Sequence, residues 1–289
     1  MTNIKDAMMK YCAGIVTYNP DLALLNDCII SIVSQVDCLI VVDNGSRNEN
    51  EIVQILNALP YKFFFLPLHS NRGVAYALNC IGEYAIMQGC EWFITLDQDS
   101  VCPPDMLQKY VLYENIEEVG MICPYIQQRI HENKRSLFLT KYKYIQIAIT
   151  SGSMLKVAAW KDVNGFWNNL FIDRVDDDIC LALRDKGWKI LQTFEVVLNH
   201  EIGHPRRHSF LSKHYYTDSY PNFRYYYIGR NTVVVCKYYK NLPYKMSKLL
   251  LRRFAKLVFG EKNKFPKIRF FINGIIDGYR WYKRGLIRE

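Results

Sequence analysis

The first 125 residues alternate short apolar runs with longer segments of helical periodicity, and this alternation restricts the possible folds more than any other feature. The apolar runs predict strands at Cys12–Tyr18, Cys38–Val42, Phe63–Leu66, Trp92–Leu96 and Val119–Pro124. The segments between them predict helices at Asp21–Gln35, Asn50–Ala58, Gly73–Gln88 and Pro104–Asn115. Strands that alternate with helices form a largely parallel sheet covered by helices. The sequence therefore predicts an α/β fold.

Polar residues follow four of these strands at the point where each strand ends. They occupy positions 17–20, 43–46, 71–73 and 97–99. Ligands of open parallel sheets bind beyond the carboxyl ends of the strands. We therefore expect a ligand site along this edge of the sheet.

The composition supports a folded chain inside the cell. Of 289 residues, 50% are hydrophobic and 22% are charged, which excludes disorder as the main state. The nine cysteines are odd in number and form no CxxC pair, so we expect reduced core residues. We expect neither a signal peptide nor a membrane-spanning helix, because the longest charge-free stretch, Tyr144–Leu155, is shorter than the ~20 residues that a span requires. These features predict a cytoplasmic protein.

The charge is concentrated at the C-terminal end. Residues 237–289 contain 15 basic and three acidic residues, a balance of +12, whereas the rest of the chain carries −3. We therefore predict two regions, 1–236 and a basic helical region, 237–289. Within it, the segment Met246–Phe259 places apolar residues on one helical face and basic residues on another; these are Met246, Leu250, Phe254 and Leu257, and Lys248, Arg252 and Lys256.

This basic region has three interpretations: a nucleic-acid arm, a helix packed on the core, and a helix on a membrane surface. A nucleic-acid arm needs no apolar stripe, so nucleic acid is not the expected partner. Lysine and arginine near an anionic bilayer contribute about 1 kcal/mol each. We expect residues 244–289 to bind an anionic membrane, with packing on the core as the alternative.

Two acidic motifs have the composition of a catalytic site. Asp97 and Asp99 follow a buried strand, and alternate residues of a strand share one side, so both can face one divalent cation. Asp176, Asp177 and Asp178 open a predicted helix, Val175–Gly187, and one of them is a candidate general base. A solvated turn and helix capping are the alternatives.

Residues 200–204 read HEIGH, which matches the HExxH pattern of zinc proteases. That chemistry requires a helix that places both histidines on one face. Here a predicted strand, Val196–Leu198, leads into the motif, and Gly203 and Pro205 disfavour a helix. We therefore expect His200 alone to act, as a metal ligand at a strand end, with an ordinary surface histidine as the alternative.

The order of these motifs resembles glycosyltransferase family 2, and most closely its bacterial rhamnosyltransferases of O-antigen and capsule assembly. The resemblance spans about residues 11–231. It is carried by TYN at 17–19, VDNGS at 42–46, NRGVAYALN at 71–79, LDQDS at 96–100, SGS at 151–153, FIDRVDDD at 171–178 and the histidine at 200. The QxxRW signature of processive members is absent, which favours addition of one or a few sugars.

The resemblance implies a GT-A fold, which is Rossmann-like, and a nucleotide-diphosphate sugar donor used with Mg²⁺ or Mn²⁺. It implies that Thr17, Tyr18 and Asn19 lie against the base, that Asp43 bonds its edge, that Arg72 approaches the phosphates and that Asp97 reaches the ribose. Asn44, Gly73, Gln98 and Ser153 are assigned to the same nucleotide-sugar site. Asp99 and His200 would hold the metal. Asp176 matches the base position, with Asp177 as its rival.

The function that we expect is inverting transfer of a sugar to a hydroxyl of a lipid-linked glycan at the cytoplasmic face of the membrane. The resemblance makes L-rhamnose from dTDP-L-rhamnose the preferred donor. Two alternatives remain at this point: nucleotidyl transfer to a sugar phosphate, which also uses carboxylate-held metal, and a non-catalytic nucleotide- or membrane-binding protein.

Overall fold

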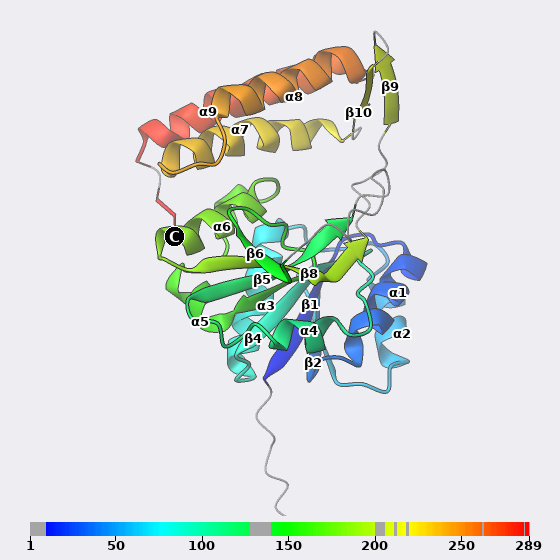
Figure 1. Ribbon diagram of the computed structural model, residues 1–289. Coiled ribbons are helices and arrows are strands. Elements are labelled where there is room, and N and C mark those ends of the chain that lie inside the picture. The colour runs from blue at the N-terminus through cyan, green and yellow to red at the C-terminus, as the bar shows by residue number, and fades with distance from the viewer. Residues whose placement is uncertain are drawn as a thin grey trace, which may run out of the picture.

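The computed structural model describes residues 10–127, 140–199, 206–210, 213–217, 220–261, 263–285 and 287–288. In these ranges the chain forms a central eight-stranded sheet with helices on its faces and a group of C-terminal helices beside it (Figure 1).

The first half of the sheet is parallel. β1 (Tyr11–Thr17) lies between β2 (Cys38–Asp43) and β4 (Trp92–Asp97), and β3 (Phe63–Pro67) pairs with the other edge of β2. All three pairings are parallel. The predicted strands are confirmed, and the carboxyl ends of β1, β2 and β4 meet at one edge.

The second half of the sheet is mixed. β7 (Ser153–Lys156) runs antiparallel between β4 and β5 (Val119–Gln127). β8 (Lys189–Asn199) is parallel to β5, and β6 (Tyr142–Ile145) is antiparallel to β8. The full order is β3-β2-β1-β4-β7-β5-β8-β6. A separate antiparallel pair consists of β9 (Arg206–Phe210) and β10 (Lys213–Thr217).

Helices cover both faces of the sheet because successive strand residues point to opposite sides. In β2, Leu39 and Val41 join one buried cluster, whereas Ile40 and Val42 join the other. The first cluster lies under α1 (Leu22–Val33), α2 (Glu49–Asn57) and α4 (Met106–Val111). The second lies under α3 (Val74–Met87), α5 (Val157–Asp162) and α6 (Val175–Asp185), with a 3₁₀ turn at Asn168–Leu170.

The C-terminal helices are α7 (Asn222–Tyr238), α8 (Met246–Gly260) and α9 (Lys264–Lys283), which lie side by side in Figure 1. α7 and α9 cross closely, since a Cβ at Gly274 or Gly278 of α9 would overlap the backbone of α7. The expected boundary after residue 236 falls inside α7. After α9 the chain returns to the α/β unit, where Figure 1 marks the C-terminus near α5 and α6.

The apolar stripe predicted in α8 divides between two environments. Leu257 is fully buried, and Leu250 is partly buried against the small cluster that Leu257 forms with residues of α7 and α9, so these two residues serve packing. Phe254 is 38% exposed. All nine cysteines are free and all but Cys236 are buried, as the sequence predicts. Among the described residues, no helix has the length and apolar character needed to cross a membrane.

Candidate active site

The candidate site lies where β1, β2 and β4 end. In the parallel register Thr17 pairs with Asp43, and Val16 pairs with Asp97, so the polar residues that follow these strands meet at one edge. Ligand sites of open α/β sheets lie at such an edge.

Asp43 is enclosed by its own loop. Its fully buried carboxylate accepts hydrogen bonds from Thr17 Oγ1 at 2.8 Å, from the backbone nitrogens of Gly45 and Ser46 at 3.1 and 2.8 Å, and from Ser46 Oγ at 2.5 Å. Buried charges need such partners. In this arrangement Asp43 and Thr17 order the loop after β2, and no oxygen of Asp43 faces solvent.

Tyr18 and Asn19, which follow β1, form hydrogen bonds to the loops that follow the neighbouring strands β2 and β4. The Tyr18 backbone nitrogen donates to Gln98 Oε1 at 2.8 Å. The Asn19 nitrogen donates to Ser46 Oγ at 2.7 Å, and Asn19 Oδ1 accepts from the Arg47 nitrogen at 2.9 Å. The Tyr18 side chain is 47% exposed. The loops are thereby fixed to one another while an aromatic ring remains accessible at the edge.

Two asparagine side chains bind the backbone just before α3 begins. Asn44 Oδ1 accepts from the Arg72 nitrogen at 2.8 Å, and Asn71 Oδ1 accepts from the Gly73 nitrogen at 3.0 Å. Gly73 has a φ of 88°, and a Cβ there would overlap the backbone of Phe171. The Arg72 guanidinium lies 3.7 Å from the Tyr76 ring centroid. A cation beside a helix N-terminus suits an anionic group such as a phosphate.

Asp97 and Asp99 follow β4, and the backbone nitrogen of Asp97 donates to Ser151 Oγ at 3.1 Å. Desolvation by the surrounding protein raises the pKa of Asp97 to about 7, and the charges of Asp176 and Asp99 add to the rise. Asp97 is nevertheless exposed to solvent, unlike the buried residues that precede it in β4. Carboxylates that repel one another are relieved by a divalent cation with oxygen ligands.

The described part of the chain contains no cluster of three His, Cys, Asp or Glu side chains that could hold a metal. His200, the expected third ligand, lies outside the described residues, as does the rest of the HExxH match at 200–204. Asp97 and Asp99 are the described residues after β4 whose carboxylate oxygens could bind a divalent cation.

Asp176 stands in the first turn of α6 and is bound by Thr150. The Thr150 nitrogen donates to Asp176 Oδ1 at 2.9 Å and the Thr150 hydroxyl donates to it at 2.6 Å. Desolvation raises the pKa of Asp176, Thr150 opposes that rise, and the charges of Asp177 and Asp173 reinforce it. Thr150 donates hydrogen bonds to the Asp176 side chain, and the next residue, Ser151, accepts one from the Asp97 backbone. These two consecutive residues therefore connect the end of β4 to α6.

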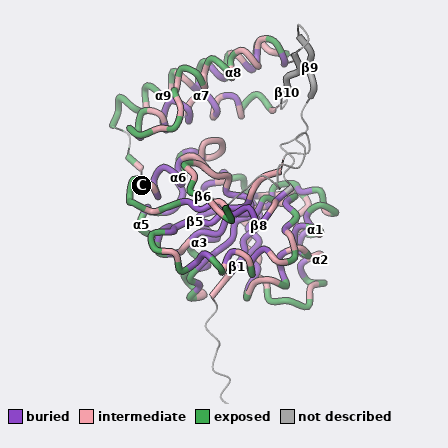
Figure 2. Tube along the Cα trace, in the orientation of Figure 1, coloured by how far each residue is buried: buried purple, intermediate pink, exposed green. Residues whose placement is uncertain are grey.

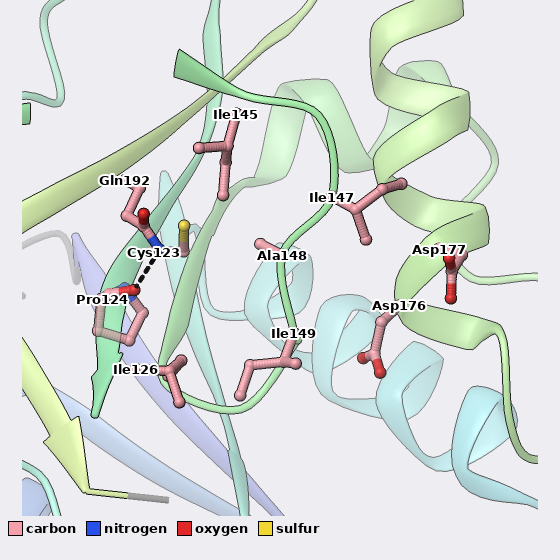
Figure 3. Close-up of a pocket in the computed structure, with 10 residues that line it drawn as sticks. All are labelled: Cys123, Pro124, Ile126, Ile145, Ile147, Ala148, Ile149, Asp176, Asp177 and Gln192. Atoms are coloured by element: carbon pink, nitrogen blue, oxygen red, sulfur yellow. Dashed lines mark hydrogen bonds between the residues drawn. The ribbon is translucent and has the colours of Figure 1, made fainter. Parts of the chain in front are cut away.

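Asp177 has different partners. It forms an ion pair with Arg174 at 3.2 Å and accepts a hydrogen bond from Tyr244, in the segment between α7 and α8, at 2.7 Å. The side chains of Asp176 and Asp177 leave α6 beside the segment that carries Ile147 and Ile149 (Figure 3). Asp177 is therefore neutralised by a cation of its own, whereas Asp176 accepts only from neutral donors among the bonds described.

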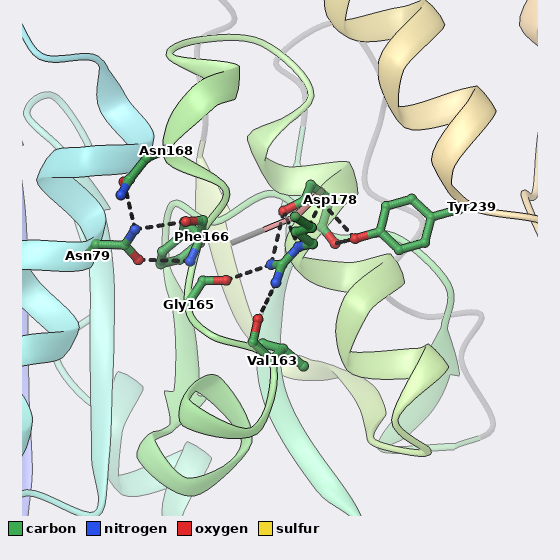
Figure 4. A network of polar contacts seen from close by, with 8 residues as sticks. Asn79, Val163, Gly165, Phe166, Asn168, Asp178 and Tyr239 are labelled. Atoms are coloured by element: carbon green, nitrogen blue, oxygen red, sulfur yellow. Dashed lines mark hydrogen bonds and ion pairs between the residues drawn. The ribbon is translucent and has the colours of Figure 1, made fainter. Parts of the chain in front are cut away.

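Asp178 is buried and structural. It binds Arg288 through an ion pair at 3.0 Å and accepts from Tyr239 of α7 at 2.7 Å. The Arg288 guanidinium also donates to the carbonyl oxygens of Val163 and Gly165. Figure 4 shows Asp178 between Tyr239 and the Val163–Gly165 turn.

Ser153, which the sequence motif assigns to the nucleotide-sugar site, does not lie with the polar residues that follow β1, β2 and β4. It is fully buried on β7 opposite Thr95, and its hydroxyl donates to the Ile149 carbonyl oxygen at 2.6 Å. Ser151 of the same SGS motif contacts Asp97 instead. Strand alternation alone cannot choose between them, because a tight turn precedes β7.

The sequence reasoning also missed Thr150, Arg174 and the ion pair of Arg224 with Asp173, 3.1 Å apart. Arg224 lies at the start of α7 and lowers the pKa of Asp97 against the larger effects that raise it. Nothing in the local pattern around Arg224 signals this, since the contact joins segments 51 residues apart.

Comparisons with known proteins identify the family of the chain. Residues 12–163 match the model of Glycosyl transferase family 2. This segment is more than half of the chain, and the protein therefore belongs to glycosyltransferase family 2 and is a glycosyltransferase.

A curated relative points in the same direction. The chain is 28% identical over 210 residues to dTDP-rhamnosyl transferase RfbF of Shigella flexneri, an alignment that covers 66% of this chain and 69% of that protein.

Solved structures share the fold. TarS of S. aureus in complex with UDP-GlcNAc matches with a TM-score of 0.59 at 14% identity, over 94% of this chain and 81% of that one. The mannosyltransferase PcManGT of Pyrobaculum calidifontis, in complex with GDP-Man and Mn²⁺, matches with a TM-score of 0.59 at 13% identity, over 98% and 89%. The expected GT-A fold is confirmed, and a nucleotide-sugar donor follows from the family.

Proposed function

We propose that the protein transfers a sugar, with inversion at the anomeric carbon, from a nucleotide-diphosphate donor to a hydroxyl of a glycan acceptor. The observation that carries the proposal is that two consecutive residues join the acidic groups: Thr150 donates to Asp176 of α6 at 2.6 Å, and Ser151 accepts from the Asp97 nitrogen at the end of β4 at 3.1 Å. Besides desolvation, the charge of Asp176 contributes to the raised pKa of Asp97. A strand-end acid and a second carboxylate can thereby face the same donor.

In this mechanism Asp176 is the general base. Its raised pKa suits a proton acceptor better than an ordinary aspartate would. The Asp176 carboxylate takes the proton of the acceptor hydroxyl, whose oxygen attacks the anomeric carbon from the side opposite the diphosphate. The bond between that carbon and the diphosphate oxygen breaks, and its electron pair leaves with the nucleotide. Asp177 is the weaker candidate, because Arg174 and Tyr244 already occupy its oxygens.

A divalent cation fits the edge where Asp97 and Asp99 lie. Oxygen donors and the mutual repulsion of carboxylates suit Mg²⁺ or Mn²⁺, and Asp99 with His200 is the ligand pair that we propose. When bound, such a cation neutralises the charge that develops on the leaving diphosphate. Two structures of the same fold, PcManGT and GalNAc-T7, were solved with Mn²⁺.

The remaining edge residues would bind the nucleotide. The exposed ring of Tyr18 and the adjacent Asn19 can lie against the base, Asp43 shapes the loop beneath it, and Arg72 at the start of α3 suits the phosphates. Gln98, Asn44 and Gly73 hold these loops in position by the hydrogen bonds and close approach described above.

The relative RfbF, a dTDP-rhamnosyl transferase, supports L-rhamnose from dTDP-L-rhamnose as the donor. We propose further that the acceptor is a lipid-linked glycan in surface polysaccharide synthesis, such as O-antigen or capsule. The enzyme would then work at the cytoplasmic face of the inner membrane.

An exposed stripe on α9 supports that location. Phe265 is 79% exposed, and Arg269, Ile272, Ile276 and Tyr279 follow on the same helical face at spacings of four and three residues. The neighbouring helix α8 also carries exposed basic residues, among them Lys248 and Arg252. Apolar and basic side chains exposed together suit the interface of an anionic bilayer. The stripe differs from the one predicted in α8, which is partly used in packing.

The experiment is a donor screen. Purified enzyme is incubated with a panel of nucleotide sugars and Mn²⁺, and release of the nucleoside diphosphate is measured with and without glycan acceptors. We expect dTDP-L-rhamnose to be consumed fastest, and NMR of the product to show an inverted anomeric centre. Consumption of another donor would change the assigned sugar, and a retained configuration would contradict the single-base mechanism.

The alternative of nucleotidyl transfer loses its support, since the family assignment defines a glycosyltransferase. Diphosphate release from a nucleoside triphosphate in the same assay would restore it.

A further inference from the structure

A pocket of about 270 Å³ opens beside the first turn of α6 (Figure 3). Its lining comes from β5, β6, β8, the segment 146–149 and α6: Cys123, Pro124, Ile126, Ile145, Ile147, Ala148, Ile149, Asp176, Asp177 and Gln192. None of these ten residues belongs to the ends of β1, β2 or β4, where the nucleotide would lie. The pocket therefore reaches Asp176 from the half of the sheet that the donor residues do not use.

The wall of the pocket is aliphatic and firmly held. Ile145, Ile147 and Ala148 pack against the core cluster that contains α3 and α6, which fixes their positions. Ile126 and Ile149 complete the wall and are partly exposed. Leaving such apolar surface in water is unfavourable by roughly 25 cal/mol for each Å². An apolar group that enters the pocket would recover this free energy.

The shape of the wall restricts that group. Faces of sugar rings stack on flat aromatic side chains, but none of the ten lining residues is aromatic. Branched aliphatic side chains surround a small, rounded substituent, such as a methyl group, more closely than a flat ring face. The volume is just below the range of small-molecule sites, about 300–1,000 Å³, which suits part of one sugar unit and not a long lipid chain.

The polar end of the pocket restricts the charge of the ligand. Two carboxylates, Asp176 and Asp177, lie there, and only Asp177 has a described cationic partner. Like charges close together cost free energy, so a phosphate or diphosphate would be disfavoured. The walls thus disfavour an anionic occupant and suit one with a hydroxyl at the Asp176 end and an apolar group at the isoleucine end.

We infer that this pocket binds a methyl-bearing part of the acceptor sugar and selects acceptors that carry such a group near the reacting hydroxyl. The methyl group can belong to a 6-deoxy sugar or to an N-acetyl group. The inference rests on the proposed function, because it takes Asp176 as the base that meets the acceptor.

The test compares two pairs of octyl glycosides as acceptors: 6-deoxy-L-mannoside with L-mannoside, and N-acetylglucosaminide with glucoside. We expect kcat/KM to favour the methyl-bearing member of one pair by about tenfold or more. Whichever pair shows the preference identifies the source of the methyl group. Ile126→Ser and Ile149→Ser should reduce the preference to about threefold or less, with the donor KM unchanged.

Two variants serve as controls. Ile149→Val keeps an aliphatic wall and should retain the preference. Ile30→Ser changes an isoleucine that is 57% exposed on α1, away from the pocket, and should behave as wild type. Circular dichroism of each variant verifies folding.

Any of the following outcomes overturns the inference: no preference within either pair, a preference that survives both serine variants, or serine variants that change the donor KM alone. If none of the glycosides is used or bound while the donor is still hydrolysed, the inference also fails. Failure of the proposed function has a different signature, namely that wild-type enzyme neither binds nor hydrolyses any nucleotide sugar.

Discussion

Arg288 and Asp178 form a buried ion pair across 110 residues of sequence, and this pair fastens the end of the C-terminal helices to α6. The Arg288 side chain is 6% exposed and that of Asp178 is fully buried. The third aspartate of the acidic triple is therefore an anchor for the helix that carries Asp176.

Breaking this pair should destabilise the protein strongly. Arg288→Ala leaves the Asp178 carboxylate buried with Tyr239 as its described side-chain donor, and we expect a loss of about 3–5 kcal/mol in the free energy of unfolding. Urea denaturation followed by tryptophan fluorescence measures it. The matched control is Arg284→Ala, an exposed arginine four residues earlier, which should change stability by about 0.5 kcal/mol at most. Equal effects of the two variants would contradict the anchoring role.

The base assignment separates Asp176 from Asp177. Asp176→Asn keeps the size of the side chain and can still accept from Thr150, but it cannot take a proton, so kcat should fall by about 10²–10⁴-fold. Asp177→Asn breaks the ion pair with Arg174 and should therefore lower Tm. Its loss of kcat should be smaller than that of Asp176→Asn. Nucleotide release with acceptor present measures the rates. A larger kcat loss in Asp177→Asn than in Asp176→Asn would transfer the base to Asp177.

Asp99 allows a test of metal binding that does not depend on turnover. In wild-type protein, Mn²⁺ with dTDP should raise Tm, because a ligand that binds only the folded state stabilises it. Asp99→Ala should abolish most of that shift and nearly all sugar transfer, and EDTA should abolish both in wild type. Asp105→Ala, on the loop before α4, is the control and should keep the shift. An undiminished Mn²⁺ shift in Asp99→Ala would contradict its role as a ligand.

The raised pKa of Asp97 predicts how the free energy of unfolding depends on pH when no metal is bound. Its pKa is about 7 in the folded state against an ordinary value of 3.8, so the folded protein binds this proton more tightly than the unfolded chain does. The stabilisation is complete below pH 3.8 and is lost as the pH rises through about 7. Asp97→Asn should therefore be more stable than wild type at pH 8, by about 1–2 kcal/mol after allowance for solvent screening, and nearly equal to it at pH 4.

Urea denaturation at both pH values, in the presence of EDTA, measures this difference. Asp185→Asn, which removes an exposed carboxylate from the end of α6, should show little dependence on pH by comparison. If Asp97→Asn is less stable than wild type at pH 8, desolvation and the charges of Asp176 and Asp99 do not raise the pKa of Asp97 as inferred.

Interactions between residues that are close in the sequence could be predicted, and interactions between distant residues could not. The strands and helices of the first 125 residues were predictable because burial imposes alternating and helical periods on adjacent residues. The strand-end motifs were predictable because parallel register brings the ends of β1, β2 and β4 together. Ser151, Tyr244 and Arg288 were not, since their partners lie 54, 67 and 110 residues away and no periodicity relates such positions.

The acidic triple illustrates the same limit. Three consecutive aspartates at a helix start look equivalent in the sequence, yet a helix turns by 100° for each residue and sends their side chains to different neighbours. Asp176 meets Thr150, Asp177 meets Arg174, and Asp178 meets Arg288. Helical geometry predicts that the three differ. The Arg174 partner of Asp177 is local, three residues earlier, whereas Thr150 and Arg288 are distant in the sequence and assign the other two.

Membrane binding is best tested by point substitutions in the C-terminal helices. Deleting residues 244–289 would also remove Tyr244 and Arg288, both of which contact α6, so a loss of binding could result from unfolding. Lys248→Glu with Arg252→Glu changes exposed residues of α8 only. Each basic residue near an anionic bilayer contributes about 1 kcal/mol, so the double variant should bind phosphatidylglycerol vesicles at least about 30-fold more weakly.

The control for charge alone is Lys62→Glu with Lys161→Glu, which reverses two exposed lysines on the α/β unit. Flotation with anionic vesicles should recover this variant as it recovers wild type, because these lysines lie outside the proposed surface. Phe265→Ser with Ile272→Ser tests the apolar part and should weaken binding even at high salt, where charge attraction is screened. Equal flotation of all variants would show that the exposed stripe on α9 serves some contact other than a bilayer.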